Sequence, residues 1–379
     1  MSFFSKAVYY CSSILLNRLF SLLPLRRNQV LFLSDVRSEL GDNFSPVYEK
    51  LGREYNKVTS LKADRRLRRS FTQWLKECYY IATSGCIFLD DFTSSTSFIR
   101  VRNGQQLVQL WHGSGAYKKF GYSRAGNDGD IRHVNPGYRK YTLAIVSSEQ
   151  VRPCFAEAFS LPLDRVAATG VPRTDRFFDE DYLRDCKIRL SKMCPEISGR
   201  KVILYAPTYR GDKVEDASYD FSKFDLESAF QALHDDYVII FKWHPALYNN
   251  IALNKIQAYD LSHYHGFAWD FSEYRDIDGL LAACDILITD YSSMIFDYAL
   301  LDKPLILYPY DQKEYEDGRG LYFDFQDYVY GSVATSTPEI IDQIRRESID
   351  ENKRAAFIRR FVSANDGNAS DRIIERVFH

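Results

Sequence analysis

The sequence predicts an α/β protein of two doubly wound domains, and three observations support this class. At 379 residues the chain exceeds the usual range of a single domain. Short apolar runs recur along the chain, each followed by a polar turn and a helical segment. The clearest example is residues 285–325, which read as an apolar run (286–288), a turn carrying Ser292 and Ser293, a helix (294–301) and a second apolar run (305–308). Such strand–turn–helix–strand units build doubly wound sheets, and the helix N-termini within them suit phosphate groups.

Composition narrows the class of protein further. Hydrophobic residues make up 45% and charged residues 26%, as in a globular protein with ample core. The net charge of −2 argues against a nucleic-acid binder, which needs a strongly basic surface. The seven cysteines form no C-x-x-C pair, so reduced thiols in a cytosolic compartment are expected, without a disulfide framework or a zinc site.

The N-terminal residues 1–28 are interpreted as an amphipathic segment that lies on a membrane surface. Apolar residues of this segment share one helical face, namely Phe4, Val8, Cys11, Leu15, Leu19 and Leu22. Arg18 interrupts the run, so an uncharged stretch long enough to span a bilayer is missing. An interfacial helix fits this pattern, and an ordinary amphipathic helix packed on its own domain is the alternative.

The first domain is predicted to begin with a core strand at residues 29–34, with further strands at 85–90, 106–111 and 142–147. Between the first two strands, residues 61–78 form a second amphipathic segment with a basic side. That side carries Lys62, Arg65, Arg66 and Arg69. An ordinary solvated face explains such a run, and docking on an anionic membrane surface or a lipid-linked pyrophosphate is the functional alternative.

Two polar positions in this domain point to a ligand. His112 stands at the end of a predicted strand and is followed by a glycine-rich turn and two lysines, in the stretch WHGSGAYKKFG. In open α/β sheets that edge is where ligands bind, so we expect His112 to take part in function. Arg173 follows Pro172 in a turn suited to reaching a ligand, and the stretch 194–199 is predicted to contain the domain boundary.

In the second domain, three predicted strand ends carry polar groups. The strands 202–205, 238–241 and 286–288 lead into Thr208 and Arg210, into Lys242 and His244, and into Ser292 and Ser293. We expect these turns to meet at one edge of one sheet, with Arg319 available to close the same site. The sequence lacks both a G-x-G-x-x-G motif after the first strand and a Walker lysine motif.

With these residues assembled, the chain resembles the CDP-glycerol glycerophosphotransferase family of teichoic acid primases and polymerases. The resemblance runs from about residue 106 to residue 368. It rests on the motifs QLWHGSGAYKKFG, TGVPRTDRFF, ILYAPTYRG, FKWHPAL, DILITDYSSMIFDYALLDKPLILYPYD and GRGLYFDF. The turn after His112 reads Gly-Ser-Gly where the polymerases frequently have Gly-Thr-Pro, which leaves the acceptor open. The chain length is more similar to members that attach a first unit than to the long processive polymerases.

The resemblance implies a glycosyltransferase B architecture, with two Rossmann-like domains facing a cleft. We expect an N-terminal acceptor-side domain at residues 29–195 and a CDP-donor-binding domain at 196–379, whose last helix could return to the first domain. The implied reaction transfers glycerol phosphate from CDP-glycerol to a hydroxyl of a lipid-linked saccharide acceptor and releases CMP. It places the enzyme peripherally on the cytoplasmic face of the cell membrane.

The resemblance also implies roles for individual residues. His112 matches the family's proposed base, and His244 and Arg319 match residues that stabilise phosphate. The positions that match donor contacts are Gly113, Arg173, Pro207, Thr208, Lys242, Ser292, Ser293 and Asp297. Neither a metal nor a cofactor is implied, since basic side chains and a helix end can carry the diphosphate charge.

Four alternatives stay open on the sequence. The donor could be CDP-ribitol, and the polymer could belong to the wall or to a capsule. A nucleotide-sugar glycosyltransferase has the same fold, and fold alone does not separate the two. A membrane-docked scaffold that has lost turnover is the alternative outside enzymes.

Overall fold

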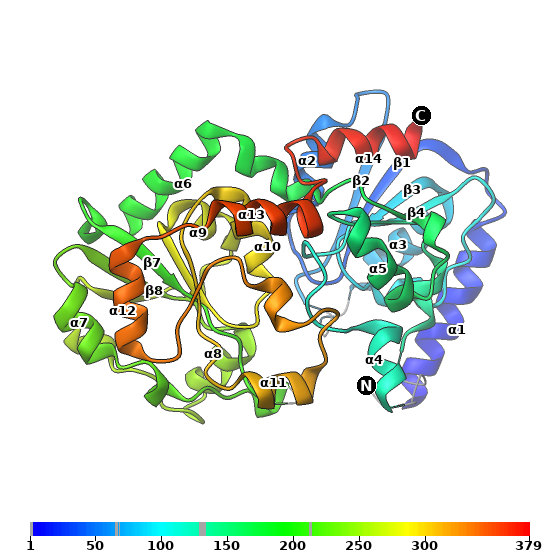
Figure 1. Cartoon of the computed structure of the whole chain (residues 1–379). Helices are drawn as coiled ribbons and strands as arrows, with labels where there is room; N and C mark the ends of the chain where they lie inside the picture. The colour runs from blue at the N-terminus through cyan, green and yellow to red at the C-terminus, as the bar shows by residue number, and fades with distance from the viewer. Residues whose placement is uncertain (1–2, 65–66, 68, 129–133, 212–213) are drawn as a thin grey trace. The chain divides into compact units, whose positions relative to one another are not determined.

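A computed structural model describes residues 3–64, 67, 69–128, 134–211 and 214–379. The chain folds into two compact units, Met1–Asp175 with Phe361–His379 and Arg176–Arg360. Each unit contains one parallel six-stranded sheet with helices against it (Figure 1). The predicted α/β class with doubly wound parallel sheets is therefore confirmed.

The sheet of the first unit has the strand order β2-β1-β3-β4-β5-β6. Its strands are β1 (Arg26–Ser34), β2 (Asn56–Leu61), β3 (Ser84–Leu89), β4 (Gln106–Gln109), β5 (Leu143–Ile145) and β6 (Val166–Ala167). All of the pairings are parallel, and the central strand β3 is buried along its whole length. A strand covered on both faces reads as an unbroken apolar run, which is why SGCIFL was recognisable in the sequence.

The helices of the first unit come from both ends of the chain. They are α1 (Phe3–Phe20), α2 (Phe44–Lys50), α3 (Phe71–Thr83), α4 (Gly121–Asp128), α5 (Arg152–Phe159) and α14 (Ala369–Phe378). Figure 1 shows the red C-terminal helix α14 beside the blue helix α2. The Asp175 carboxylate fixes the start of α14, because it accepts hydrogen bonds from the backbone N–H groups of Ala369 and Ser370, both at 2.9 Å.

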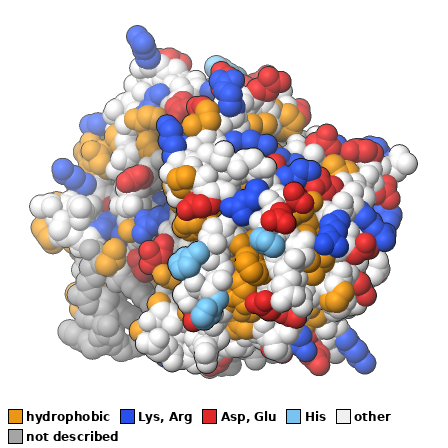
Figure 2. Space-filling view, turned by 90° about the vertical axis from the view of Figure 1, so that its left-hand side faces the viewer, with side chains coloured by type: hydrophobic (Ala, Val, Ile, Leu, Met, Phe, Trp, Pro, Cys, Tyr) orange, Lys and Arg blue, Asp and Glu red, His pale blue; other side chains and the backbone are white. Residues whose placement is uncertain are grey.

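The sheet of the second unit has the order β12-β11-β10-β7-β8-β9. Its strands are β7 (Lys201–Tyr205), β8 (Tyr237–Phe241), β9 (Ala268–Asp270), β10 (Ile286–Thr289), β11 (Leu305–Leu307) and β12 (Ser332–Val333). Its helices are α6 (Glu180–Met193), α7 (Leu226–Leu233), α8 (Pro245–Ala252), α9 (Ile277–Ala283), α10 (Met294–Tyr298), α11 (Gln312–Arg319), α12 (Thr337–Arg346) and α13 (Glu351–Phe357). Figure 2 shows acidic and basic side chains interspersed on one face of the molecule, so neither sign of charge dominates there.

The limits of the two units differ from the predicted boundary at 195/196. Helix α6 packs against α9 of the second unit, where Lys187 lies 3.4 Å from Asp285 and Arg189 lies 3.4 Å from Asp276. The chain therefore passes from the first unit to the second after residue 175, before α6, and returns to the first unit after residue 360. The Pro- and Gly-containing stretch 194–199 is a loop within the second unit, between α6 and β7.

Helix α1 packs against α3 with its more polar face. Trp74 Nε1 donates a hydrogen bond of 3.0 Å to Ser13 Oγ, and the ring of Tyr9 lies 5.8 Å from that of Trp74. The opposite face presents Leu15 and Leu19, which are 59% and 51% exposed. The helix thus contacts its own unit and also leaves the predicted apolar face uncovered. Within the described residues, none of the helices combines the length and the apolar character needed to cross a membrane.

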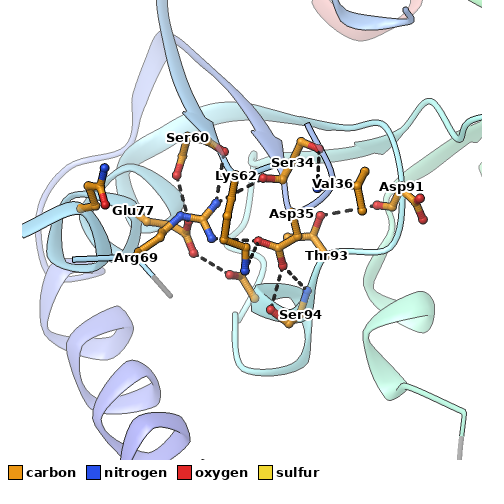
Figure 3. A network of polar contacts seen from close by, with 12 residues as sticks. Ser34, Asp35, Val36, Ser60, Lys62, Arg69, Glu77, Asp91, Thr93 and Ser94 are labelled. Carbon is orange, nitrogen blue, oxygen red and sulfur yellow. Dashed lines mark hydrogen bonds and ion pairs between the residues drawn. The ribbon is translucent and has the colours of Figure 1, made fainter. Parts of the chain in front are cut away.

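A buried ion network ties the carboxyl ends of β1 and β2 to helix α3 (Figure 3). Arg69 bridges two acids, with Nη1 2.8 Å from Asp35 and Nε 2.5 Å from Glu77. Lys62 Nζ adds a second cation 3.2 Å from Asp35. Burial would raise the pKa of Asp35, but the hydrogen bond and charge of Arg69 outweigh it and leave the pKa below its ordinary value. Burial raises the pKa of Glu77, against the opposing charge of Arg69.

This network corrects the predicted basic face. The Arg69 side chain is 9% exposed and that of Lys62 is 12% exposed, and both are paired with Asp35. The sequence shows four basic residues at close spacing but not the acids that come from β1 and α3 to meet them. Arg65 and Arg66 lie outside the described residues.

Because Arg69 is the cation between two buried acids, replacing it should lower the stability strongly. We expect Arg69→Met to lower the free energy of unfolding by about 3–5 kcal/mol, since it leaves Asp35 and Glu77 without their shared partner. The matched control is Arg184→Met, whose ion pair with Asp181 is exposed, and this change should cost less than about 1 kcal/mol. Urea titration followed by circular dichroism measures both variants, and equal losses would contradict the assignment.

Candidate active site

In the second unit, three neighbouring strands end at the same level of the sheet. Ile288 of β10 pairs with Tyr205 of β7, and Tyr205 in turn pairs with Phe241 of β8. The three turns that follow these strands therefore lie side by side at one sheet edge. These turns carry Pro207 and Thr208, Lys242 and His244, and Ser292 and Ser293. The convergence expected from the sequence is present in the structure.

Asp290 joins two of these turns. One of its carboxylate oxygens, Oδ1, accepts hydrogen bonds from the backbone N–H of Thr208 at 2.8 Å and from that of Tyr291 at 2.7 Å. The other oxygen, Oδ2, lies 2.9 Å from Arg210 Nη1. Because both turns bind the same carboxylate, Thr208 and the serines after Tyr291 are held in one fixed arrangement.

Arg210 connects Asp290 to a third turn, the one that follows β11. Its guanidinium binds both carboxylate oxygens of Asp311, which follows β11. The rings of Tyr291, Tyr310 and Tyr315 surround its charge at 5.0–5.3 Å. Burial disfavours the charge, but the carboxylates outweigh it, so the pKa of Arg210 lies above its ordinary value. We call the linked side chains of Asp290, Arg210 and Asp311 the latch. The sequence predicted that Arg210 lies at the carboxyl edge of the sheet but did not indicate the latch, since the two aspartates lie about 80 and 100 residues away from Arg210.

His244 is fixed by the start of helix α8. Its Nδ1 accepts a hydrogen bond of 3.1 Å from the backbone N–H of Ala246, and its ring packs 4.6 Å from that of Tyr209. An imidazole nitrogen that accepts a hydrogen bond carries no proton, so neutral His244 has its proton on Nε2. The exposed ring can therefore donate a hydrogen bond from Nε2 to an anionic ligand.

Lys242 is half-buried beside this histidine. Its ammonium donates a hydrogen bond of 2.7 Å to the backbone carbonyl of Ser272. Burial lowers the pKa of Lys242 below its ordinary value. A desolvated ammonium held at a strand end interacts more strongly with an anion than one in open solvent.

The serine turn differs in detail from its prediction. The predicted helix 294–301 consists of α10 (Met294–Tyr298) and a 3-10 turn (Ala299–Leu301). Ser293 occupies the N-cap position with no capping hydrogen bond from its side chain, whereas Ser292 Oγ accepts one of 3.3 Å from Met294 N–H. With only five α-helical residues the macrodipole at this turn is short, so an anion here would depend mainly on hydroxyl and basic side chains.

The remaining predicted site residues are distributed over both units. Asp297 is buried inside α10, at 3% exposure. Arg319 is the last residue of α11, and its side chain lies outside the described residues. Gly113 and Arg173 belong to the first unit, with His112. The structure thus brings Thr208, Lys242, His244 and the two serines together, while the roles of the other residues stay predictions.

His112 lies at the carboxyl edge of the first sheet, three residues after β4. Its Nδ1 lies 3.5 Å from Asp91 Oδ2, and its ring lies 4.4 Å from that of Trp111. The glycine-rich turn behind it is tethered, because Gly115 N–H donates to Ser147 Oγ at 2.9 Å. That hydroxyl donates in turn to the carbonyl of Phe361, so the returning C-terminal segment supports the turn.

Asn43 connects the His112 turn with Arg173. Its Nδ2 donates a hydrogen bond of 2.7 Å to the carbonyl of Trp111, and its Oδ1 accepts one of 3.0 Å from the backbone N–H of Arg173. This link could not be predicted from the sequence, because a single asparagine in a loop has no motif around it. Within the described residues we find no group of three or more His, Cys, Asp or Glu side chains that could hold a metal ion.

Comparison with known proteins identifies the family. The sequence profile of CDP-glycerol:poly(glycerophosphate) glycerophosphotransferases matches residues 15–379. The chain belongs to this family. The resemblance predicted from the motifs is thereby confirmed.

The relatives of this family member include enzymes named for either polyol. The chain is 40% identical over 361 residues to a teichoic acid poly(ribitol-phosphate) polymerase of Bacillus spizizenii. The aligned region covers 94% of this chain and 57% of that polymerase. A teichoic acid ribitol-phosphate primase of the same organism is 33% identical, over 94% of this chain and 92% of the primase. The teichoic acid glycerol-phosphate primase of Bacillus subtilis is 31% identical, over 79% of this chain and 75% of the primase. The chain thus spans little more than half the length of the first of these relatives.

The solved structure of the wall teichoic acid polymerase TagF has the same fold as this family member. The TM-score is 0.76 at 24% identity, and the match covers 99% of this chain and 96% of the TagF chain. The glycosyltransferase B type of architecture, with two Rossmann-like units, is thereby confirmed.

The cap geometry of His244 separates its structural role from any chemical role. We expect His244→Ala to lower stability by about 1 kcal/mol, because the Ala246 N–H loses its partner. His244→Asn should retain most of that stability, since asparagine is a good N-cap residue. The measurement is the urea midpoint of both variants against the parent. If the asparagine variant is no more stable than the alanine variant, the side chain does not act as a cap.

Proposed function

We propose that this protein transfers a polyol phosphate from a CDP-activated donor to a hydroxyl of a lipid-linked saccharide acceptor, with release of CMP, in the synthesis of teichoic acid or a related cell-surface polymer. The observation that carries the proposal is the convergence of three strand ends in the second unit. Their turns bring a lysine, a histidine and two serines to one edge, held by the Asp290–Arg210–Asp311 latch. Such groups suit the diphosphate of a CDP-linked donor.

The chemistry assigned to this edge is stabilisation of charge. In phosphoryl transfer the hydroxyl oxygen attacks phosphorus while the bond to the leaving phosphate breaks, and negative charge grows on the oxygens. His244 can donate from Nε2 to such an oxygen, and Lys242 adds a fixed positive charge. Ser292 and Ser293 offer hydroxyl groups beside them. Arg319 is proposed to counter the charge of the departing CMP, as its match to the family motif implies.

His112 is proposed as the base of the reaction. It lies exposed at a sheet edge of the first unit, where its ring can meet an acceptor hydroxyl. Histidine titrates near neutral pH, so it can take the hydroxyl proton as the oxygen attacks. Gly113 and Arg173 are proposed to contact the donor.

The relatives favour ribitol phosphate as the first group to test. The three relatives with 34–40% identity are named as ribitol-phosphate polymerases, whereas the glycerol-phosphate primases share 28–31%. The family itself is described by glycerophosphate transfer, and a TagF variant has been solved with CDPG. Both CDP-ribitol and CDP-glycerol are therefore candidate donors.

Membrane attachment is proposed through α1. A lipid-linked acceptor keeps its pyrophosphate at the bilayer surface, so an enzyme that uses it gains by lying there. The exposed leucines of α1 form an apolar face that can enter the interface. Lys62 and Arg69 take no part in this proposal, because their side chains are largely covered and are paired with Asp35.

Nucleotide-sugar chemistry is the competing activity. A UDP-GlcNAc 2-epimerase of Neisseria meningitidis has the related fold, with a TM-score of 0.56 at 16% identity, which speaks to fold alone. The product distinguishes the two activities, because polyol-phosphate transfer releases CMP and sugar transfer releases a nucleoside diphosphate.

The decisive assay supplies CDP-ribitol and CDP-glycerol separately, each with a series of lipid-linked saccharide acceptors. We expect CMP release with at least one donor. The mass of the acceptor should increase by the mass of one or more polyol phosphate groups. His112→Ala should lower this rate by about 10²–10⁴-fold and leave donor binding nearly unchanged in calorimetry. Binding of neither donor, or CMP release that His112→Ala does not slow, would contradict the proposal.

The membrane proposal is tested by cosedimentation with vesicles that contain phosphatidylglycerol. Replacing both Leu15 and Leu19 by Gln should weaken binding by roughly tenfold or more, because each leucine loses apolar area that the interface would bury. The matched control is Leu253→Gln, which removes a leucine of similar exposure from the second unit and should bind like the parent. If all three proteins sediment equally, α1 is not the attachment site.

A further inference from the structure

Asp91 is the acidic group next to His112. The distance from His112 Nδ1 to Asp91 Oδ2 is 3.5 Å, and the Asp91 side chain is 18% exposed whereas that of His112 is 47% exposed. The contact is longer than an ordinary N–H···O hydrogen bond, as catalytic contacts commonly are before the substrate binds. The two residues come from neighbouring strands, since β3 ends just before Asp91 and β4 ends just before the His112 turn.

The backbone around His112 is held in a strained conformation. Trp111 has a φ of +59°, which is rare for a bulky residue. Two side chains fix it there, since Gln109 Oε1 accepts from Trp111 N–H at 2.8 Å and Asn43 Nδ2 donates to the Trp111 carbonyl at 2.7 Å. Gln109 also donates to the carbonyl of Asp91 at 3.2 Å, so the same side chain ties the two strand ends together. Strain that persists under such support is typical of functional sites.

Two neighbouring acids at this sheet edge bind basic side chains. Asp90 is buried and its carboxylate binds Arg37 Nε at 2.6 Å. Asp35 binds Lys62 and Arg69 in the ion network. Of these three acids, Asp91 has the carboxylate oxygen that lies near His112.

We propose that Asp91 is a positioning residue that sets the tautomer of His112. Its carboxylate accepts the hydrogen of Nδ1, which leaves the lone pair of Nε2 to act as the base. As the acceptor oxygen forms its bond to phosphorus, its proton moves to Nε2, and CMP leaves with the electrons of the broken P–O bond. The imidazolium then faces the Asp91 carboxylate, which stabilises its charge, by the logic of histidine–aspartate pairs in hydrolases. This inference rests on the proposed role of His112 as the base.

The first arm of the test observes the tautomer directly. Protein labelled with ¹⁵N-histidine is examined by NMR at a pH where the ring is neutral, and the His112 signal is assigned by its loss in His112→Gln. We expect the proton on Nδ1 in the parent and on Nε2 in Asp91→Asn, whose amide would donate to Nδ1. A parent with the proton already on Nε2, or a tautomer unchanged in Asp91→Asn, would overturn the proposal. This arm needs neither donor nor acceptor.

The second arm is a double-mutant cycle with the donor that the transfer assay accepts. Asp91→Asn should lower kcat by about 10²–10⁴-fold with the KM of the donor changed less than about twofold, because Asp91 acts through His112. The double variant His112→Ala/Asp91→Asn should be no slower than His112→Ala alone. The matched control Asp371→Asn removes an exposed carboxylate of the same unit and should leave kcat unchanged.

The outcomes separate the two proposals. If His112→Ala turns over normally, the base is wrong and the role of Asp91 falls with it. If His112→Ala is slow but Asp91→Asn is normal, or if the two losses multiply in the double variant, only the role of Asp91 is overturned. Thermal unfolding of each variant shows that it folds, and the tautomer observed by NMR decides the matter for any variant with reduced stability.

Discussion

The candidate site of the second unit depends on one carboxylate. Asp290 accepts backbone N–H groups from two turns and faces Arg210, which carries the connection on to Asp311. Without it, the turns after β7 and β10 would each need another partner for buried backbone groups. The latch costs desolvation, as every buried ion pair does, and in return it fixes where the polar side chains of these turns lie. A site that must stabilise developing charge gains from groups that do not have to move.

In the first unit, the loops that follow the strands are also held in place by polar side chains. Asp35 gathers Lys62, Arg69 and the backbone of Ser94 at the ends of β1 and β3, and Asn43 joins the His112 turn to Arg173. In both units a short polar side chain at a strand end serves as the anchor of loops that are distant in sequence. The parallel sheet makes this necessary, because all of its crossover loops leave from the same edge and must be held there.

The short α10 changes the physical account of anion binding at the serine turn. A long helix would contribute a macrodipole and several free N–H groups, but here five α-helical residues follow Ser293. More of the charge balance therefore falls on Lys242, on the Nε2 proton of His244 and on hydroxyl groups. Two of these side chains are held by hydrogen bonds to backbone, since Lys242 donates to the Ser272 carbonyl and His244 Nδ1 accepts from the Ala246 N–H.

The sequence by itself determined the fold class, the inner strands of both sheets and the family, but it did not indicate the short edge strands β2, β6, β9 and β12. Buried parallel strands read as apolar runs, and the motifs that identify the family are local, so both could be recognised without coordinates. It also determined that Thr208, Lys242, His244 and the serines would share an edge, because carboxyl ends of parallel strands always do. Only the tertiary structure decided which charged residues are covered and which partners they bind. Lys62 and Arg69 were predicted to form a basic face, yet their side chains are largely covered and pair with Asp35, and Arg210 links Asp290 to Asp311. The tertiary structure also decided that helix α6 belongs to the second unit and that Asp91 lies beside His112. The partner of a charged side chain is set by contacts between segments that are distant in the sequence. A local sequence pattern cannot show which distant segments come into contact.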